Sequence, residues 1–196
     1  MSQDNVLNVS TGKPKVGGAI FSAPDGTAVP TDAVAPLAPA FENVGFCSDS
    51  GLTNDISTDT GSIKAWGGVE VMKPQTSRTE SFKYTMIETN PIALARIFGE
   101  ENVIVDSTNP DNFTVKHNAK ERDVRPWVIE ILLANDRVKR IVIPRGQITS
   151  LDSIIYNDSN AIGYVDITTG WYRQSANTGT GILIERYRCS AEMVPA

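Results

Sequence analysis

The sequence is poor in the residues from which most active sites and metal centres are built. It has two cysteines and one histidine among 196 residues. It contains no Cys-x-x-Cys, His-Glu-x-x-His or Gly-x-Ser-x-Gly pattern and no phosphate-binding loop. We therefore expect no catalytic residue, no metal site and no cofactor. Both cysteines are expected to stay as thiols in a reducing cytoplasm.

Basic residues are missing from a long part of the chain. None occurs between Lys15 and Lys64, whereas that interval contains six acids, and the whole sequence has a formal net charge of -5. The acids are Asp25, Asp32, Glu42, Asp49, Asp55 and Asp59. This balance excludes the basic footprint of a tight nucleic-acid binder. It leaves open whether the acids have a role of their own or only keep loops soluble.

Long apolar runs are also missing. No segment approaches the roughly 20 residues that a membrane-spanning helix needs, and the first residues lack a basic-then-apolar signal pattern. We expect a protein made in the cytoplasm with no membrane partner.

The amino-terminal part predicts an arm rather than a domain. Residues 1–15 are polar without apolar periodicity, residues 16–21 read VGGAIF and predict a strand, and residues 22–39 contain four prolines that favour an extended connector. We predict an arm and connector over residues 1–39 and a single β-sandwich domain over residues 40–196. The connector either clamps a neighbouring subunit or is a disordered linker.

A long β-hairpin is predicted in the centre of the chain. Residues 63–73 and 79–89 have the period-two pattern of strands with one packed and one solvated face, and residues 74–78 separate them. The preceding residues 48–63 are so rich in Ser, Thr, Asp and Asn that they predict a loop. A hairpin of this length offers an extended edge that neighbouring subunits of a ring could cover.

A short helix is predicted directly after the hairpin, over residues 92–98. Asn90 is suited to the N-cap, Pro91 to the first helical position and Gly99 to the terminus. Further strands are predicted around residues 127–133 and 138–143, joined by a turn at Asn135 and Asp136, and at residues 154–156, 162–172 and 182–187. The fold class is therefore mainly β, a β-sandwich or barrel with one short peripheral α-helix and long hairpins whose edges could join across subunits into a ring.

Several short motifs occur in one order through residues 48–99: SDSGL, IKAWGG, ESFKYTMIETNP and a terminal FG. In this order they resemble the major tail proteins, or tail tube proteins, of long-tailed non-contractile bacteriophages. Residues 12–33 look like the amino-terminal portion of the same family. The residues that carry the central resemblance are Asp49, Gly51, Leu52, Ile63, Lys64, Ala65, Trp66, Gly67, Gly68, Phe82, Thr85, Glu88, Thr89, Asn90 and Gly99.

The resemblance implies a structural protein of the virion tail and no enzyme. It implies stacked, hexameric rings that enclose a tape-measure protein and conduct DNA without binding it specifically, with tail tip and tail terminator proteins as further partners. Composition and periodicity do not give the number six. The alternative is a stand-alone β-sandwich binding or adhesion module of a virion or surface protein, because the strand pattern alone fits both.

Two sets of residues are candidates for the assembled state. Subunit interfaces are expected at Val16, Gly17, Gly18, Ala19, Ile20, Phe21, Asp49, Gly51, Leu52, Asp55, Trp66, Gly67 and Gly68, with residues 48–63 forming the loop that stacks one ring on the next. An acidic lumen is expected to be lined by Glu70 and Glu80, with Glu88 and Glu130 as further candidates. Because a slip of one residue exchanges the two faces of a strand, these acids could instead face outward.

Overall fold

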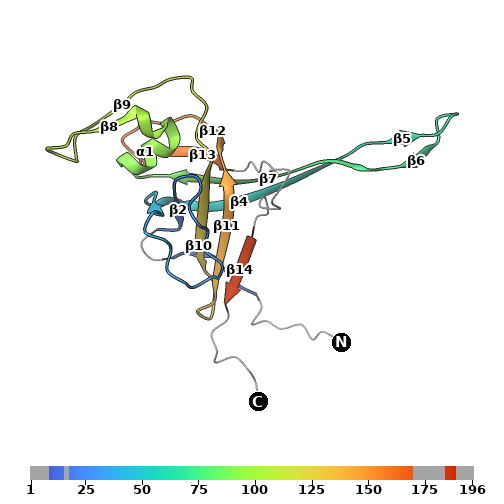
Figure 1. Cartoon of the computed structure of the whole chain (residues 1–196), viewed down its shortest axis with the longest axis horizontal. Coiled ribbons are helices and arrows are strands. Elements are labelled where there is room, and N and C mark those ends of the chain that lie inside the picture. The colour runs from blue at the N-terminus through green and yellow to red at the C-terminus, as the bar shows by residue number, and fades with distance from the viewer. Residues whose placement is uncertain (1–8, 16–17, 170–183, 189–196) are drawn as a thin grey trace, which may run out of the picture.

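Two antiparallel sheets stacked on one another make up the body of the protein, and a long hairpin arm extends from it (Figure 1). The structure is a computed structural model that describes residues 9–15, 18–169 and 184–188. In this part of the chain strands predominate and neither sheet closes into a barrel. The prediction of a mainly β sandwich with one short α-helix is confirmed.

The larger sheet has six strands. Its order is β14 (Ile184–Arg188), β11 (Val138–Gly146), β10 (Arg125–Leu132), β2 (Ile20–Ser22) and β3 (Glu42–Asn43), while β1 (Lys13–Pro14) pairs with β10 beside β2. The predicted turn between β10 and β11 is confirmed, with Asn135 and Asp136 both at positive φ, as a tight hairpin turn requires. Because β1 and β2 belong to this sheet, residues 13–14 and 20–22 are part of the body.

The smaller sheet has four strands in the order β12 (Ile148–Ser150), β13 (Tyr164–Thr169), β7 (Gln75–Met86) and β4 (Cys47–Thr60). Alternate residues of β7 (Phe82, Tyr84 and Met86) are buried against Trp127 and Ile129 of β10. The inter-sheet core thus follows the period-two pattern of the sequence.

The proline-rich connector covers the opposite face of the large sheet. Val128 and Val142 of that face are fully buried with Ala23 and Phe41, and Leu37 packs against them. This cover explains why β10 is buried on both faces over residues 125–130. The connector therefore lies across its own domain.

The helix is found where the sequence predicts it. α1 (Pro91–Phe98) begins with Asn90, whose Oδ1 accepts from the amide of Ala93 at 2.7 Å, and ends at Gly99 with φ 100°. A 3₁₀ turn (Glu100–Asn102) follows, and then the small hairpin of β8 (Val103–Val105) and β9 (Phe113–Val115).

The prediction of the long hairpin is wrong in its pairing. The strand that forms the hairpin with β7 is β4, which is the polar segment predicted to be the stacking loop. Their register partners run from Cys47–Met86 to Thr60–Gln75. Residues 63–73 are no single strand: β5 (Ile63–Lys64) and β6 (Glu70–Met72) pair with one another across a turn at Gly67 and Gly68. A strand exposed on both faces needs no apolar alternation, so β4 resembles a loop in composition.

Smaller differences occur elsewhere in the sheets. β11 continues beyond the expected residue 143 through Pro144 to Gly146. In place of a strand at residues 154–156 there is one isolated bridge between Ile155 and Gly163. The predicted strand residues 170–172 and 182–183 lie outside the described residues.

Candidate assembly surfaces

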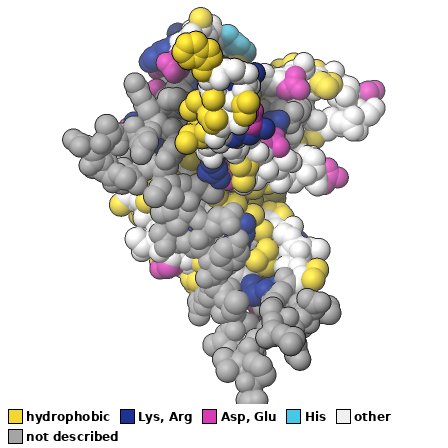
Figure 2. Space-filling model, turned by 90° about the vertical axis from the view of Figure 1, so that its right-hand side faces the viewer, with side chains coloured by type: hydrophobic (Ala, Val, Ile, Leu, Met, Phe, Trp, Pro, Cys, Tyr) yellow, Lys and Arg dark blue, Asp and Glu magenta, His cyan; other side chains and the backbone are white. Residues whose placement is uncertain are grey.

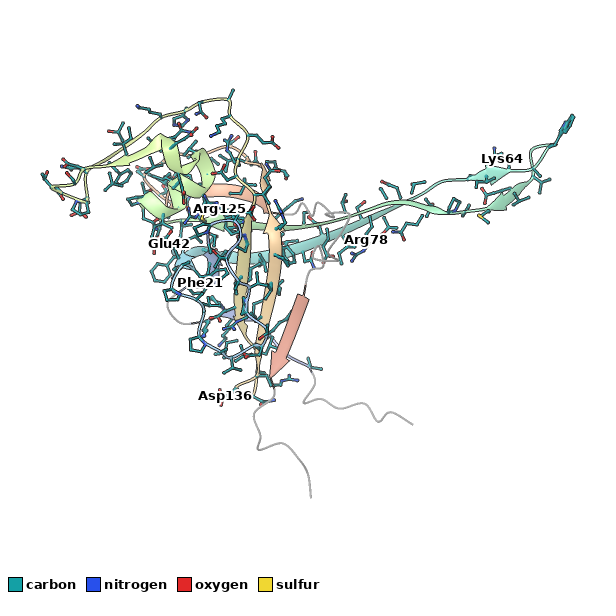
Figure 3. The ribbon with its side chains drawn as sticks, viewed as in Figure 1. Phe21, Glu42, Lys64, Arg78, Arg125 and Asp136 are labelled. Atoms are coloured by element: carbon teal, nitrogen blue, oxygen red, sulfur yellow. The ribbon has the colours of Figure 1, made fainter. Side chains whose placement is uncertain are left out.

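The most prominent feature for assembly is the arm formed by β4 and β7 and continued by β5 and β6. In Figure 3, Arg78 lies along the arm and Lys64 near its far end, well away from the body. The twelve residues of β7 correspond to about 40 Å of extended chain at ~3.3 Å per residue. The outer part of this ribbon is exposed on both faces.

The end of the arm is apolar. We define the tip as the exposed hydrophobic residues of this end, which are Ile63, Trp66, Val69, Val71 and Met72. Trp66 is fully exposed, and the other four are between 51% and 68% exposed. In Figure 2, viewed from the side of the tip, hydrophobic side chains gather over the end of the arm. A contiguous apolar patch on a polar ribbon indicates a contact surface.

The register of the arm sorts its side chains onto two faces. Leu52–Tyr84, Asn54–Phe82 and Ile56–Glu80 are cross-strand partners on the face that turns toward the core within the body. The intervening pairs lie on the solvent face, and they are Thr53–Lys83, Asp55–Ser81, Ser57–Thr79 and Asp59–Ser77. On this solvent face Lys83 pairs with Asp55 at 2.9 Å, and Ser77 donates to Asp59 at 2.7 Å. Hydroxyls and aspartates therefore dominate it.

The small sheet has two free edges within the described part of the chain, because β4 and β12 are its terminal strands. β4 leaves its outer row of backbone donors and acceptors without a partner strand along an edge of fourteen residues. A long free edge is a template for pairing with another chain.

A family model described as phage tail tube protein matches residues 9–179. The chain belongs to this family. No curated protein matches the sequence. Tail tube proteins form a structural, non-enzymatic family, located in the virion tail, whose members assemble with themselves into a tube. The resemblance seen in the sequence motifs is thereby confirmed at the level of the family.

The amino-terminal interface candidates of this tail tube protein are engaged with their own chain. Ile20 is buried in the core, and Phe21 pairs with Val128 of β10 and packs beneath the connector. Gly18 has φ 114°, and a β-carbon there would collide with the side chain of Asn43. Ala19 accepts a hydrogen bond from the amide of Glu130 at 2.7 Å, whereas Val16 and Gly17 lie outside the described residues. A contact of this segment with another subunit stays a prediction.

The remaining interface candidates are all on the arm. Asp49, Gly51 and Asp55 are exposed along β4, and Leu52 is half-buried at the point where the arm leaves the body. Gly51 has φ 76° within an irregular stretch of the β4–β7 register, so the glycine of the SDSGL motif occupies a position that side chains disfavour. Trp66, Gly67 and Gly68 form the turn at the far end. The structure thus places the candidates of both motifs on one protruding element.

The lumen candidates are scattered. Glu70 is exposed near the tip, where it accepts from Ser62 and pairs with Lys73. Glu80 lies on the core-side face and pairs with Arg78, and Glu88 is half-buried and accepts from Asn90. Glu130 is only 2% exposed and pairs with Arg140, so it presents no charge to any surface. Its burial removes it from the lumen candidates.

Two buried arginine clusters fix the body and were missed by sequence reasoning. Arg96 of α1 donates to Ser22 Oγ at 2.7 Å and pairs with Glu42 and Glu100, and Glu100 also pairs with Arg125. Burial alone would raise the pKa of the Glu100 carboxyl, but the hydrogen bonds and charges of Arg125 and Arg96 outweigh it and hold the pKa below its usual range. The helix is thereby tied to β2 and to the start of β10.

The second cluster joins the connector to the large sheet. Arg140 Nε donates to Glu130 Oε1 at 2.9 Å, and Arg140 Nη1 donates to the carbonyls of Asp32 and Ala35 at 3.0 and 2.9 Å. Lys15 Nζ lies 2.8 Å from the second carboxylate oxygen of Glu130. No local sequence signal marks this pairing, because its members are up to about a hundred residues apart in the chain.

Nothing among the described side chains indicates chemistry. They include no group of three His, Cys, Asp or Glu residues that could hold a metal ion. His117 packs its ring on Phe98, with centroids 4.3 Å apart, in keeping with a loop-packing role. Burial raises the pKa of the Cys47 thiol to about 11, with the Glu88 charge contributing, so Cys47 is a weak nucleophile. No helix in the described part is long and apolar enough to cross a membrane.

Proposed function

We propose that this tail tube protein polymerises as stacked rings, six subunits in each as the family resemblance implies. The tube would enclose the tape-measure protein and conduct DNA during ejection, and tail tip and tail terminator proteins would bound its ends. The observation that carries the proposal is the arm: a long, two-stranded, solvated ribbon with an apolar tip.

The arm is poorly suited to a protein that acts as a monomer. A two-stranded ribbon is marginally stable in water, and the outer part of this one buries little apolar surface. Its tip exposes apolar side chains to water instead of covering them. Both features are accounted for when the arm lies against another subunit, and its length favours a contact with the next ring.

Ring closure is proposed to use the edges of the small sheet. A cyclic ring needs two different surfaces on each subunit that match one another, and β4 and β12 are two such edges of one sheet. If the small sheets join edge to edge, the large sheet and α1 lie on one side of the resulting wall. Since that side is the bulkier, it fits outside the ring, and the solvent face of the small sheet lines the lumen.

This arrangement changes the acids that we propose for the lumen. The solvent face of the arm carries Asp55 and Asp59 with serine and threonine hydroxyls, whereas Glu80 is on the other face. Lys83 offsets Asp55, so the wall would be weakly acidic and richly hydroxylated. A wall without a basic stripe does not retain DNA.

The test removes the tip without disturbing the body. Residues 61–74 are replaced by Asn-Gly, which joins the register partners Thr60 and Gln75 through a two-residue hairpin turn. We expect the variant to keep the unfolding midpoint of the wild type, because the removed residues contact no buried core residue. We expect rings or monomers but no tubes by negative-stain electron microscopy.

A matched control shortens the other exposed hairpin. Residues 106–112 are replaced by Asn-Gly between the partners Val105 and Phe113, and tubes should still form. Normal tubes from the variant without a tip would refute the role of the arm. A wild-type protein that stays monomeric at all concentrations would favour the stand-alone binding module.

A further inference from the structure

A second exposed apolar surface lies at the end of the small sheet opposite the tip. We call it the base row, formed by Phe46, Ile155 and Tyr156, which are 63%, 57% and 72% exposed. The amide of Ile87 donates to the carbonyl of Phe46 at 3.0 Å, and Ile155 is bridged to Gly163.

The residues next to the base row show which face it occupies. Cys47, Met86 and Tyr164 are partners across β4, β7 and β13, and all three contribute to the core. Phe46 directly precedes Cys47, and Ile87 directly follows Met86. Because successive side chains of a strand alternate between its two faces, Phe46 and Ile87 point to the solvent face. Ile155, through its bridge to Gly163, is on the same face, whereas Ile154 packs against the core. Phe46 and Ile155 therefore share the solvent face at this end of the sheet, and Tyr156, the residue after Ile155, is exposed at the same end.

Charge distinguishes the two ends of the sheet. The tip region, residues 63–73, carries Lys64 and Lys73 against one acid, Glu70. The base row lies among segments without basic residues: residues 40–50 and 151–163 contain no Lys or Arg, and Asp49, Asp152 and Asp158 are exposed there. The base row and the tip are thus both apolar and of opposite charge, as the two halves of one contact should be.

We propose that the base row of one subunit receives the tip of a second copy of this chain in the neighbouring ring. This inference rests on the proposed function and identifies the receiving side of its stacking contact. Because β7 runs from the tip to the base row, a copy displaced along the strand direction brings its tip to the base row of the next. A contact between two different surfaces repeats without closing and so extends a tube. Trp66, Phe46 and Tyr156 are aromatic anchors of the kind that dominate interface energies.

Among the described residues, an exposed apolar pair on the small hairpin also competes for the tip. Ile104 and Val105 of β8 are 49% and 42% exposed on the small hairpin, which also lies at the end of the molecule away from β5 and β6 (Figure 1). They are less exposed than the base row and include no aromatic residue. The experiment is designed to separate the two sites.

The experiment uses disulfide trapping between differently marked full-length chains. A Trp66→Cys chain is mixed with a Tyr156→Cys chain and with wild type, assembled into tubes and oxidised. Linked peptides are then identified by mass spectrometry. A disulfide forms only where the two α-carbons approach within about 7 Å. Since loss of the Trp66 ring weakens the contact itself, Lys64→Cys serves as a second tip variant. The matched control replaces the Tyr156→Cys chain with an Ile104→Cys chain.

We expect the linked 66–156 or 64–156 peptide in tubes, its loss when the tubes are dissociated before oxidation, and no link to position 104. Links to position 104 instead of 156 would assign the tip to the small hairpin and overturn the inference. Tubes that yield neither link would also overturn it, while leaving the proposed function intact. Failure of wild type to form tubes would contradict the proposed function itself.

Discussion

At the scale of single residues, the buried pair of Arg140 and Glu130 joins the connector to the body. Glu130 interrupts a strand that is otherwise apolar from Pro126 to Leu132, and the guanidinium of Arg140 bridges its carboxylate to the carbonyls of Asp32 and Ala35. A charge in such a place is tolerated only when it is paired and hydrogen-bonded. The pair therefore couples the fold of residues 32–35 to that of the large sheet.

Replacing Arg140 with Met should destabilise the protein by about 3–5 kcal/mol, because it leaves the Glu130 carboxylate buried with a single cation at its edge. The double variant E130M/R140M should recover much of this loss, since an apolar pair avoids the uncompensated charge. Denaturant unfolding of the monomer measures both effects.

The control for this prediction is Arg78→Met on the arm, where Arg78 pairs with Glu80 at 2.9 Å and its side chain is half exposed. An exposed ion pair contributes at most about 1 kcal/mol, so this variant should unfold almost as the wild type does. Equal losses for Arg78→Met and Arg140→Met would contradict the assigned role of the buried pair.

At the scale of elements, local sequence signals were enough to predict α1 but not to predict the strand pairing of the arm. Asn90, Pro91 and Gly99 fix the helix ends through neighbours three or four residues away, so the sequence predicted both its place and its caps. The pairing of β7 with β4 depends on contacts between residues about fifteen to forty positions apart. β4 has a loop-like composition because water, not a core, surrounds its outer part. The strands on both sides of the core were predictable from alternation, whereas the pairing of β4 was not.

Asn90→Ala should cost about 1–2 kcal/mol of stability. The change removes the acceptor for the Ala93 amide and the donor to the carbonyl of Val44 at 3.3 Å, so it affects both the helix start and its attachment to the chain before β4. Thermal unfolding followed by circular dichroism measures the change. Asn109→Ala is the matched control, because Asn109 Oδ1 accepts only a local turn bond from Asp111 in an exposed loop; a shift as large as that of Asn90→Ala would argue against the cap.

At the scale of the whole molecule, the two faces of the small sheet have different environments. One face of the small sheet is closed by the large sheet and α1, and the other carries exposed side chains along β4 and the outer part of β7. The sequence indicated a sandwich with long hairpins. Which side chains face the core and which face water depended on the strand register, because a shift of one residue moves every side chain to the opposite face. The candidates Glu80 and Asp55 show the difference: they are both on the arm, and the pairing of β4 with β7 puts them on opposite faces.

The charge of the solvent face leads to the last prediction. If this face lines the tube, changing Asp55 and Asp59 to Lys converts it to a basic stripe, because Lys83 is already there. Repetition around each ring would multiply the added charge, and each new phosphate contact would make DNA binding stronger and more sensitive to salt. Screening over about 8 Å at physiological salt restricts the effect to DNA inside the tube. Tubes of the double variant should retain DNA during ejection and release it as salt is raised, whereas tubes carrying Glu80→Lys, on the opposite face, should eject as the wild type does. Retention by the Glu80→Lys tubes alone would mean that the other face of the arm lines the lumen.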